Sequence, residues 1–196
     1  MANPLPIDER LETAAQLVLR ARIFYDIWRF YDGDETRPAI IDAMRRYSEF
    51  FRYDPHAHFF SFIVHMAALL EARQDTINLP NLSKEFRDSG LIEARVAVEV
   101  DALLQQATPF ASKVAILRSN LFAHRSVSLS YAEAFNKAAV TPNELRELTE
   151  IALKIVNRLL ISRGFTCHVF NGLPLSCAEA MLKALSEHAS ENLDDG

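Results

Sequence analysis

The chain has 196 residues, 49% of them hydrophobic, which is enough for one well-packed domain and short for two. Its 21 Lys and Arg against 26 Asp and Glu leave a net charge of −5, which argues against non-specific binding to duplex nucleic acid over a broad face but leaves room for one focused site. The longest apolar run, 59–70, is too short to span a bilayer, so no membrane association is expected. Only two cysteines occur, Cys167 and Cys177, and no signal peptide precedes the first helix, so a cytoplasmic location is expected.

The first predicted element is a long amphipathic helix that ends near Gly33. Its apolar residues recur in steps of three and four, the spacing of one helix face: Ile7, Leu11, Ala14, Val18, Ala21, Tyr25 and Trp28. A second helix is predicted to begin at 36–38 and to continue through Phe51. Asp54, followed by a proline, is typical of an N-cap and predicts a third helix that runs to about Arg73.

Glycine and proline mark the boundaries of the next helices. A short helix is predicted between a cap at Asn81 or Ser83 and an end at Gly90. A helix over 91–107 follows, and Pro109 is expected to interrupt it, because proline lacks the backbone N–H that a helix interior uses. A further helix then carries apolar residues at Phe110, Val114, Leu117 and Leu121.

Two capping-box spacings predict the last helices. Thr141 and Glu144 are expected to begin a helix that ends at Gly164. Ser176 and Glu179 have the same spacing and are expected to begin a final helix.

The expected fold class is all-α. No segment alternates with the period of a strand, and all five glycines fall where apolar periodicity stops, as expected of residues that separate helices. We therefore expect a bundle of about six to eight helices with an up-and-down core, in one domain over 1–189. An acidic flexible tail is expected over 190–196.

The charge pattern singles out one window of this acidic chain. No Asp or Glu occurs over 102–132, yet the window holds Lys113, Arg118, His124 and Arg125. A cationic segment without carboxylates is typical of an anion site, and RNA phosphate is the first candidate.

An arginine followed by a histidine at similar spacing occurs three times, so the spacing alone decides nothing. Arg52–His58 and Arg163–His168 each straddle a helix boundary, whereas Arg118–His124 runs through one continuous helical pattern. In a regular helix Arg118 and His124 would lie about 120° apart around the helix axis, so both could border one cleft. His124 also continues the apolar stripe of its helix, which leaves a buried core histidine as an open alternative.

The run 117–125, Leu-Arg-Ser-Asn-Leu-Phe-Ala-His-Arg, resembles the signature of HEPN domains: an arginine, a polar residue, mostly apolar residues, then histidine. Four further features resemble the AbiU2-like HEPN group of bacterial abortive-infection proteins. They are the long first helix, the aromatic-rich helix over 59–70, the connector with Asp75, Asn78, Leu79 and Leu82, and the closing helix from Thr141. The resemblance covers roughly residues 5–165.

The resemblance implies an α-helical bundle that forms a homodimer and brings two Arg118–His124 pairs into one cleft. Many members are metal-independent ribonucleases, so it also implies cleavage of single-stranded RNA without cofactor or metal, leaving a 2′,3′-cyclic phosphate. The implied setting is phage defence or the toxin of a toxin–antitoxin pair, with an antitoxin protein as partner.

The resemblance assigns catalytic roles to Arg118 and His124. His124 would act as general base or acid, because imidazole ordinarily titrates at about pH 6.5. Arg118 would stabilise the pentavalent phosphorane, since a guanidinium can hold two phosphate oxygens. The expected RNA-binding residues are Ser119, Asn120, Arg125 and Lys113.

A non-catalytic HEPN-like helical dimer, acting as an interaction or regulatory module, is the alternative. It rests on the apolar stripe through His124 and on Ser119, which stands where the family often has Asn or Asp. Some members carry a tyrosine two positions after the histidine as the target of a modifying partner, but Ser126 stands there, so that modification is not implied. No metal is expected, because the remaining histidines and both cysteines lack metal-ligand spacing.

Overall fold

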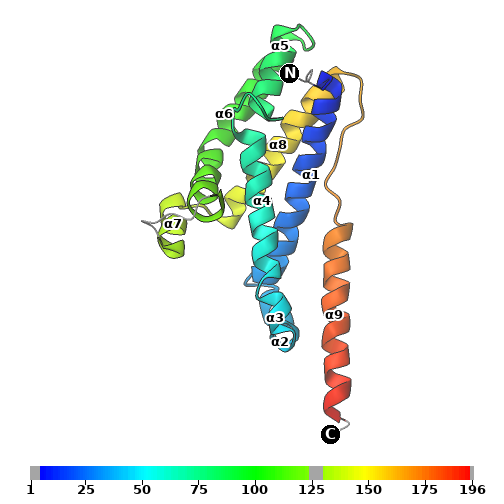
Figure 1. Ribbon diagram of the computed structural model, residues 1–196. Helices are drawn as coiled ribbons and strands as arrows, with labels where there is room; N and C mark the ends of the chain where they lie inside the picture. The colour runs from blue at the N-terminus through cyan, green and yellow to red at the C-terminus, as the bar shows by residue number, and fades with distance from the viewer. Residues whose placement is uncertain (1–4, 124–129, 195–196) are drawn as a thin grey trace.

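A computed structural model describes residues 5–123 and 130–194 of the chain (Figure 1). All regular structure in these two segments is helical, so the predicted all-α class is confirmed, and none of their helices is long and apolar enough to cross a membrane. The elements in chain order are α1 (Ile7–Asp32), α2 (Arg37–Arg46), α3 (Ser48–Phe51), α4 (Asp54–Leu70), α5 (Leu79–Asp88), α6 (Ala94–Leu117), a π-helical turn η1 (Arg118–Ala123), α7 (Tyr131–Ala138), α8 (Pro142–Ser162) and α9 (Leu173–Asp194).

Helices α1, α4, α6 and α8 enclose the main hydrophobic core. In Figure 1 α1 runs alongside α4 and α8, and α6 packs on α8 from the other side. The α1 stripe is buried as predicted, with its central members fully removed from solvent: Leu11, Ala14, Val18 and Ala21. Truncation of a large side chain in such a core typically costs about 2–5 kcal/mol, so the packing of these four helices stabilises the fold. They form the frame on which α6 presents its C-terminal end.

A second, smaller cluster lies at the far end of α1, where α2, α3 and α9 meet it. Its buried members are Tyr31, Ile40, Ala43, Met44, Phe51 and Leu182. The last of these comes from α9, which continues to Asp194 and so enters the 190–196 segment predicted as a tail. The division into a domain over 1–189 and a tail stays a prediction.

The connector between α8 and α9 is tied to the bundle by side chains. Asn157 of α8 donates from Nδ2 to the carbonyl of His168 at 2.8 Å and accepts the N–H of the same residue at 2.9 Å. Farther along, the ring of Phe170 lies under the guanidinium of Arg22, 4.5 Å from its centroid. The connector is therefore held against α1 and α8, and it sets where α9 begins.

The prediction that Pro109 interrupts a helix is wrong. Pro109 lies inside α6, which buries residues on both sides of it, including Ala107 and Val114. A proline in a helix interior costs roughly 3 kcal/mol, and packing of both halves of α6 against α4 and α8 offsets this. The hydroxyl of Thr108 donates to the Leu104 carbonyl at 2.9 Å, one residue before the Gln105 carbonyl that the missing N–H would have bonded.

The caps of three helices differ from those predicted. Asn78, and neither Asn81 nor Ser83, caps α5, because its Oδ1 accepts the N–H of Asn81 at 2.9 Å. Asp54 makes no capping bond and lies within the first turn of α4, where its carboxylate is 3.6 Å from His58 Nε2. The final helix begins at Leu173, before the predicted Ser176, and the N–H of Leu173 bonds to Asn171 Oδ1.

Other boundaries are confirmed. Thr141 and Glu144 form the predicted capping box at the start of α8, with both reciprocal bonds present. Gly164 follows α8 at φ +76° and Gly90 follows α5 at φ +64°, a left-handed conformation that glycine adopts without strain. The second predicted helix is divided at Tyr47, whose φ of −105° and ψ of 40° break the helix between α2 and α3.

Candidate functional site

The candidate site begins where α6 changes from α-helical to π-helical geometry. Arg118 is the C-cap of α6 and the first residue of η1. A π-turn closes i→i+5 bonds, so the 100° step of a regular helix does not apply from Arg118 to Ala123. The side chain of Asn120 donates from Nδ2 to the Ile116 carbonyl at 2.7 Å, the acceptor that the Asn120 N–H itself would take in an α-helix.

His124, Arg125 and Ser126 lie outside the described residues, so their predicted roles stay predictions. The described chain before them ends with η1, and after them it resumes at Ser130. Ser130 forms a capping box with Glu133 at the start of α7, with the Ser130 N–H bonded to Glu133 Oε2 at 2.7 Å. The Ser-x-x-Glu spacing is present in the sequence and could have been used to predict α7.

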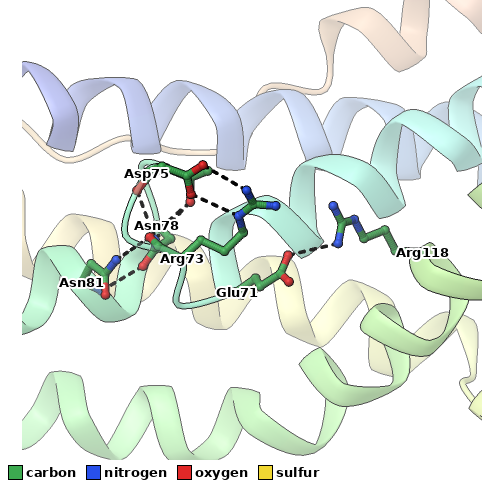
Figure 2. A network of polar contacts seen from close by, with 7 residues as sticks. Glu71, Arg73, Asp75, Asn78, Asn81 and Arg118 are labelled. Carbon is green, nitrogen blue, oxygen red and sulfur yellow. Dashed lines mark hydrogen bonds and ion pairs between the residues drawn. The ribbon is translucent and has the colours of Figure 1, made fainter. Parts of the chain in front are cut away.

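Arg118 forms an ion pair with Glu71, the residue that follows α4. Its Nη1 lies 3.2 Å from Glu71 Oε2, and Figure 2 shows the two side chains pointing toward each other from different helices. About a third of the Arg118 side chain remains exposed (32%). The sequence of the window 102–132 contains no carboxylate, but the folded chain brings the Glu71 carboxylate next to Arg118. The expectation of an isolated cationic segment is therefore wrong at this residue.

Lys113 is also paired with a carboxylate from another helix. Its Nζ lies 2.6 Å from Glu144 Oε1 and donates to the Ala139 carbonyl at 2.8 Å. Ala139 ends α7 at φ +46°, and Glu144 belongs to the capping box of α8. The hydrogen bond from Lys113 holds the pKa of the Glu144 carboxyl below its usual range. Lys113 therefore joins α6 to the turn between α7 and α8.

Lys113→Met is expected to lower the free energy of unfolding by about 1 kcal/mol, because it removes two charge-assisted hydrogen bonds, one to the partly buried Glu144 carboxylate and one to the exposed Ala139 carbonyl. Urea unfolding at neutral pH measures the loss. Lys154→Met on the exposed face of α8 serves as the matched control and should leave the unfolding midpoint unchanged. Equal unfolding midpoints for the two variants would show that Lys113 does not stabilise the contact between α6 and the turn between α7 and α8.

A pocket of about 260 Å³ opens beside Arg118, between the end of α4 and the end of α6. Glu71, Ser112, Arg118 and Ser119 bring polar groups to its lining, and the remaining lining residues are small or apolar. A second pocket of about 340 Å³ continues from it and shares the lining residues Leu70, Thr108 and Ala111. The Arg118 guanidinium and the Ser119 hydroxyl can donate hydrogen bonds to an anion here, whereas the Ser112 hydroxyl donates to the Thr108 carbonyl at 3.0 Å.

The other candidates from the sequence do not form a site in the described part of the chain. Cys167 and Cys177 are both exposed and unbonded to each other. His65 has its Nδ1 2.6 Å from the Ser61 carbonyl, and His58 lies against Asp54 and the ring of Phe24. No group of three or more His, Cys, Asp or Glu suited to a metal ion occurs within the described ranges.

Comparison with known proteins identifies a family. The family HEPN_AbiU2, described as AbiU2, matches residues 5–163, which is most of the chain and includes α1 through α8. No curated protein and no solved structure matches.

Proposed function

The chain belongs to the AbiU2 family of HEPN domains, and from this premise we propose that it is a metal-independent endoribonuclease acting on single-stranded RNA. Its setting would be phage defence or the toxin of a toxin–antitoxin pair. The observation that carries the proposal is the position of Arg118: the motif arginine is partly exposed on the rim of a pocket, where a phosphate can reach it, and is not enclosed in the core.

In the proposed reaction His124 takes the proton from a ribose 2′-OH, and the 2′-oxygen attacks the adjacent phosphorus. The bond from phosphorus to the 5′-oxygen breaks, and the leaving oxygen takes a proton from a general acid. The products are a 2′,3′-cyclic phosphate and a 5′-hydroxyl. Arg118 stabilises the charge that develops on the equatorial phosphoryl oxygens.

Flanking phosphates would be held by polar groups next to the catalytic pair. Ser119 contributes a hydroxyl on the same pocket, and Asn120 and Arg125 are assigned to neighbouring phosphates. Lys113 lies five residues before Arg118, roughly 7.5 Å along the helix axis, and adds a positive charge on that side. Its ammonium would exchange Glu144 for phosphate to bind directly.

The proposal includes a homodimer that places two Arg118–His124 pairs in one cleft. A ribonuclease that is toxic in the cytoplasm also needs a restraint, and an antitoxin protein is the partner that we propose. Size-exclusion chromatography with light scattering tests the homodimer, and co-purification with the product of an adjacent reading frame tests the antitoxin partner.

The purified protein is expected to cleave unstructured RNA at an unchanged rate in excess EDTA, because no step in the proposed reaction uses a metal. Mass spectrometry of the fragments should find 2′,3′-cyclic phosphate ends. A 2′-deoxy oligonucleotide of the same sequence is the control and should remain intact, since it lacks the attacking oxygen. Cleavage abolished by EDTA, or cleavage of the deoxy strand, would refute the proposed chemistry.

A non-catalytic helical module is the second candidate, and one observation favours it. Both described cations of the motif window already have carboxylate partners, Lys113 with Glu144 and Arg118 with Glu71. A stable dimer that cleaves none of a varied set of RNAs would support this candidate over the ribonuclease.

A further inference from the structure

The partner of Arg118 comes from a connector that the ribonuclease proposal does not use. Glu71 stands 47 positions before Arg118 in the sequence, at the end of α4. Glu71 accepts a hydrogen bond from one guanidinium nitrogen, Nη1, and among the described residues the other N–H groups of Arg118 have no hydrogen-bond partner.

The backbone of Glu71 is fixed on both sides. Its N–H bonds to the Ala67 carbonyl at 2.9 Å, which continues α4 by one residue, and its own carbonyl accepts the N–H of Arg73 at 2.8 Å. Arg73 in turn holds Asp75 through two parallel bonds, from Nε at 3.1 Å and from Nη2 at 3.0 Å. The chain after Glu71 thus turns sharply and is closed on itself.

The carbonyl of Arg73 is the centre of the connector, as Figure 2 shows. It accepts Nδ2 of Asn78 at 2.8 Å and Nδ2 of Asn81 at 2.6 Å. Asn78 is fully buried, and its Nδ2 also donates to the Thr76 carbonyl at 3.1 Å while its Oδ1 caps α5. The polar groups of the connector 71–78 are therefore hydrogen-bonded to one another and to α4 and α5, and these bonds hold the backbone of Glu71 in place.

Glu71 has two opposite effects on an anion bound at Arg118. It restricts the rotamers of a long side chain that otherwise has many, which favours one orientation of the guanidinium. It also places a negative charge on the lining of the same pocket, which opposes the approach of phosphate. The first effect matters most in the transition state, where geometry is critical, and the second weakens binding of the RNA ground state.

We propose that Glu71 is a positioning residue for Arg118, which orients the guanidinium toward the scissile phosphate at the expense of ground-state RNA affinity. This inference rests on the ribonuclease proposed above. It gives the connector 71–78 a function: it holds one carboxylate at a set place beside the pocket.

Two substitutions separate orientation from charge. Glu71→Gln keeps a hydrogen-bond acceptor for Arg118 and removes the charge, so KM for RNA should fall roughly 3- to 10-fold with kcat within about 3-fold of wild type. Glu71→Ala removes both, so KM should fall similarly while kcat falls roughly 10-fold or more. Asp42→Asn on α2 is the matched control, because Asp42 is also an exposed carboxylate paired with an arginine, and both constants should be unchanged.

A merely structural role would give a different pattern. If both variants lowered kcat and raised KM, with a lower thermal midpoint, Glu71 would act on stability and the inference would be overturned. Equal kcat for wild type and Glu71→Ala would overturn it as well. Rescue of kcat by glutamine but not by alanine is the signature of orientation.

Binding of an uncleavable 2′-O-methyl RNA, measured by fluorescence anisotropy, separates failure of this inference from failure of the ribonuclease. Glu71→Gln should bind it roughly 3- to 10-fold more tightly than wild type, because the negative charge on the pocket lining is gone. If Glu71→Gln bound this RNA no more tightly than wild type, the inference would be overturned whether or not the protein cleaves RNA. A wild type that binds the RNA without cleaving unmodified RNA would refute the ribonuclease only, and one that neither binds nor cleaves would refute both.

Discussion

His124→Ala is expected to abolish RNA cleavage, with kcat reduced roughly 10²- to 10⁴-fold, because a positioned general acid or base contributes about that factor. Arg118→Ala should reduce kcat roughly 10²- to 10³-fold, the usual loss when a donor to the developing phosphoryl charge is removed. Initial rates on a fluorescent single-stranded RNA in EDTA measure both. The two losses should be far from additive in the double variant, since the residues act on one transition state.

Controls of the same residue types are available in the described chain. His168→Ala removes a histidine that pairs with Glu12 on α1, and Arg95→Ala removes a largely exposed arginine at the start of α6. Both should keep wild-type rates. If His124→Ala retained the wild-type rate in a preparation whose controls behave as expected, the catalytic assignment would be lost, and any cleavage would have to come from other residues or from a contaminant.

Asn78→Leu is expected to lower the free energy of unfolding by about 3 kcal/mol, the largest effect on stability that we predict. Leucine has nearly the same volume, but it removes the cap of α5, for which about 1 kcal/mol is typical, and two donor bonds of about 1 kcal/mol each from a fully buried position. For a chain of this size the thermal midpoint should fall by roughly 6–12 °C. Differential scanning calorimetry measures the shift.

Asn136→Leu, on the exposed face of α7, is the control for the substitution itself and should stay within about 0.5 kcal/mol of wild type. Asn78→Asp tests which part of the side chain matters, because it keeps the capping oxygen and removes the donor. A loss for Asn78→Leu no greater than for Asn136→Leu would show that the connector 71–78 does not depend on this side chain.

Local sequence signals predicted the helices that depend on local chemistry. The α1 stripe, the Thr141–Glu144 capping box and the turn at Gly164 each depend on residues that are close in sequence, and each is confirmed. Pro109 was misread because its effect is decided by distant packing: α6 continues through it since both halves bury residues against other helices. Asn78 was missed as a cap although its capping bond to Asn81 is local, because Asn81 and Ser83 are also cap-forming residue types, and the bond to Arg73 that fixes Asn78 lies in a turn that has no helical period.

Contacts between residues distant in sequence also decide the candidate site, and the sequence did not predict them. The motif itself is local, so Arg118 could be selected from the sequence together with its family. Its partner Glu71 is separated from it by the whole of α5 and α6, and Glu144 is separated from Lys113 by α7. A count of charges along the chain cannot detect ion pairs that only the packing of helices creates.

The segment that matches the AbiU2 family ends at residue 163, but the hydrophobic packing of the chain continues beyond that residue. Leu182 lies beyond that point, is fully buried, and packs with Tyr31 and Met44 of α1 and α2. A chain cut at the family boundary would lose Leu182 from this cluster. The segment matched by the family and the hydrophobic packing of this protein therefore have different boundaries, and α9 takes part in the packing although it lies outside the matched segment.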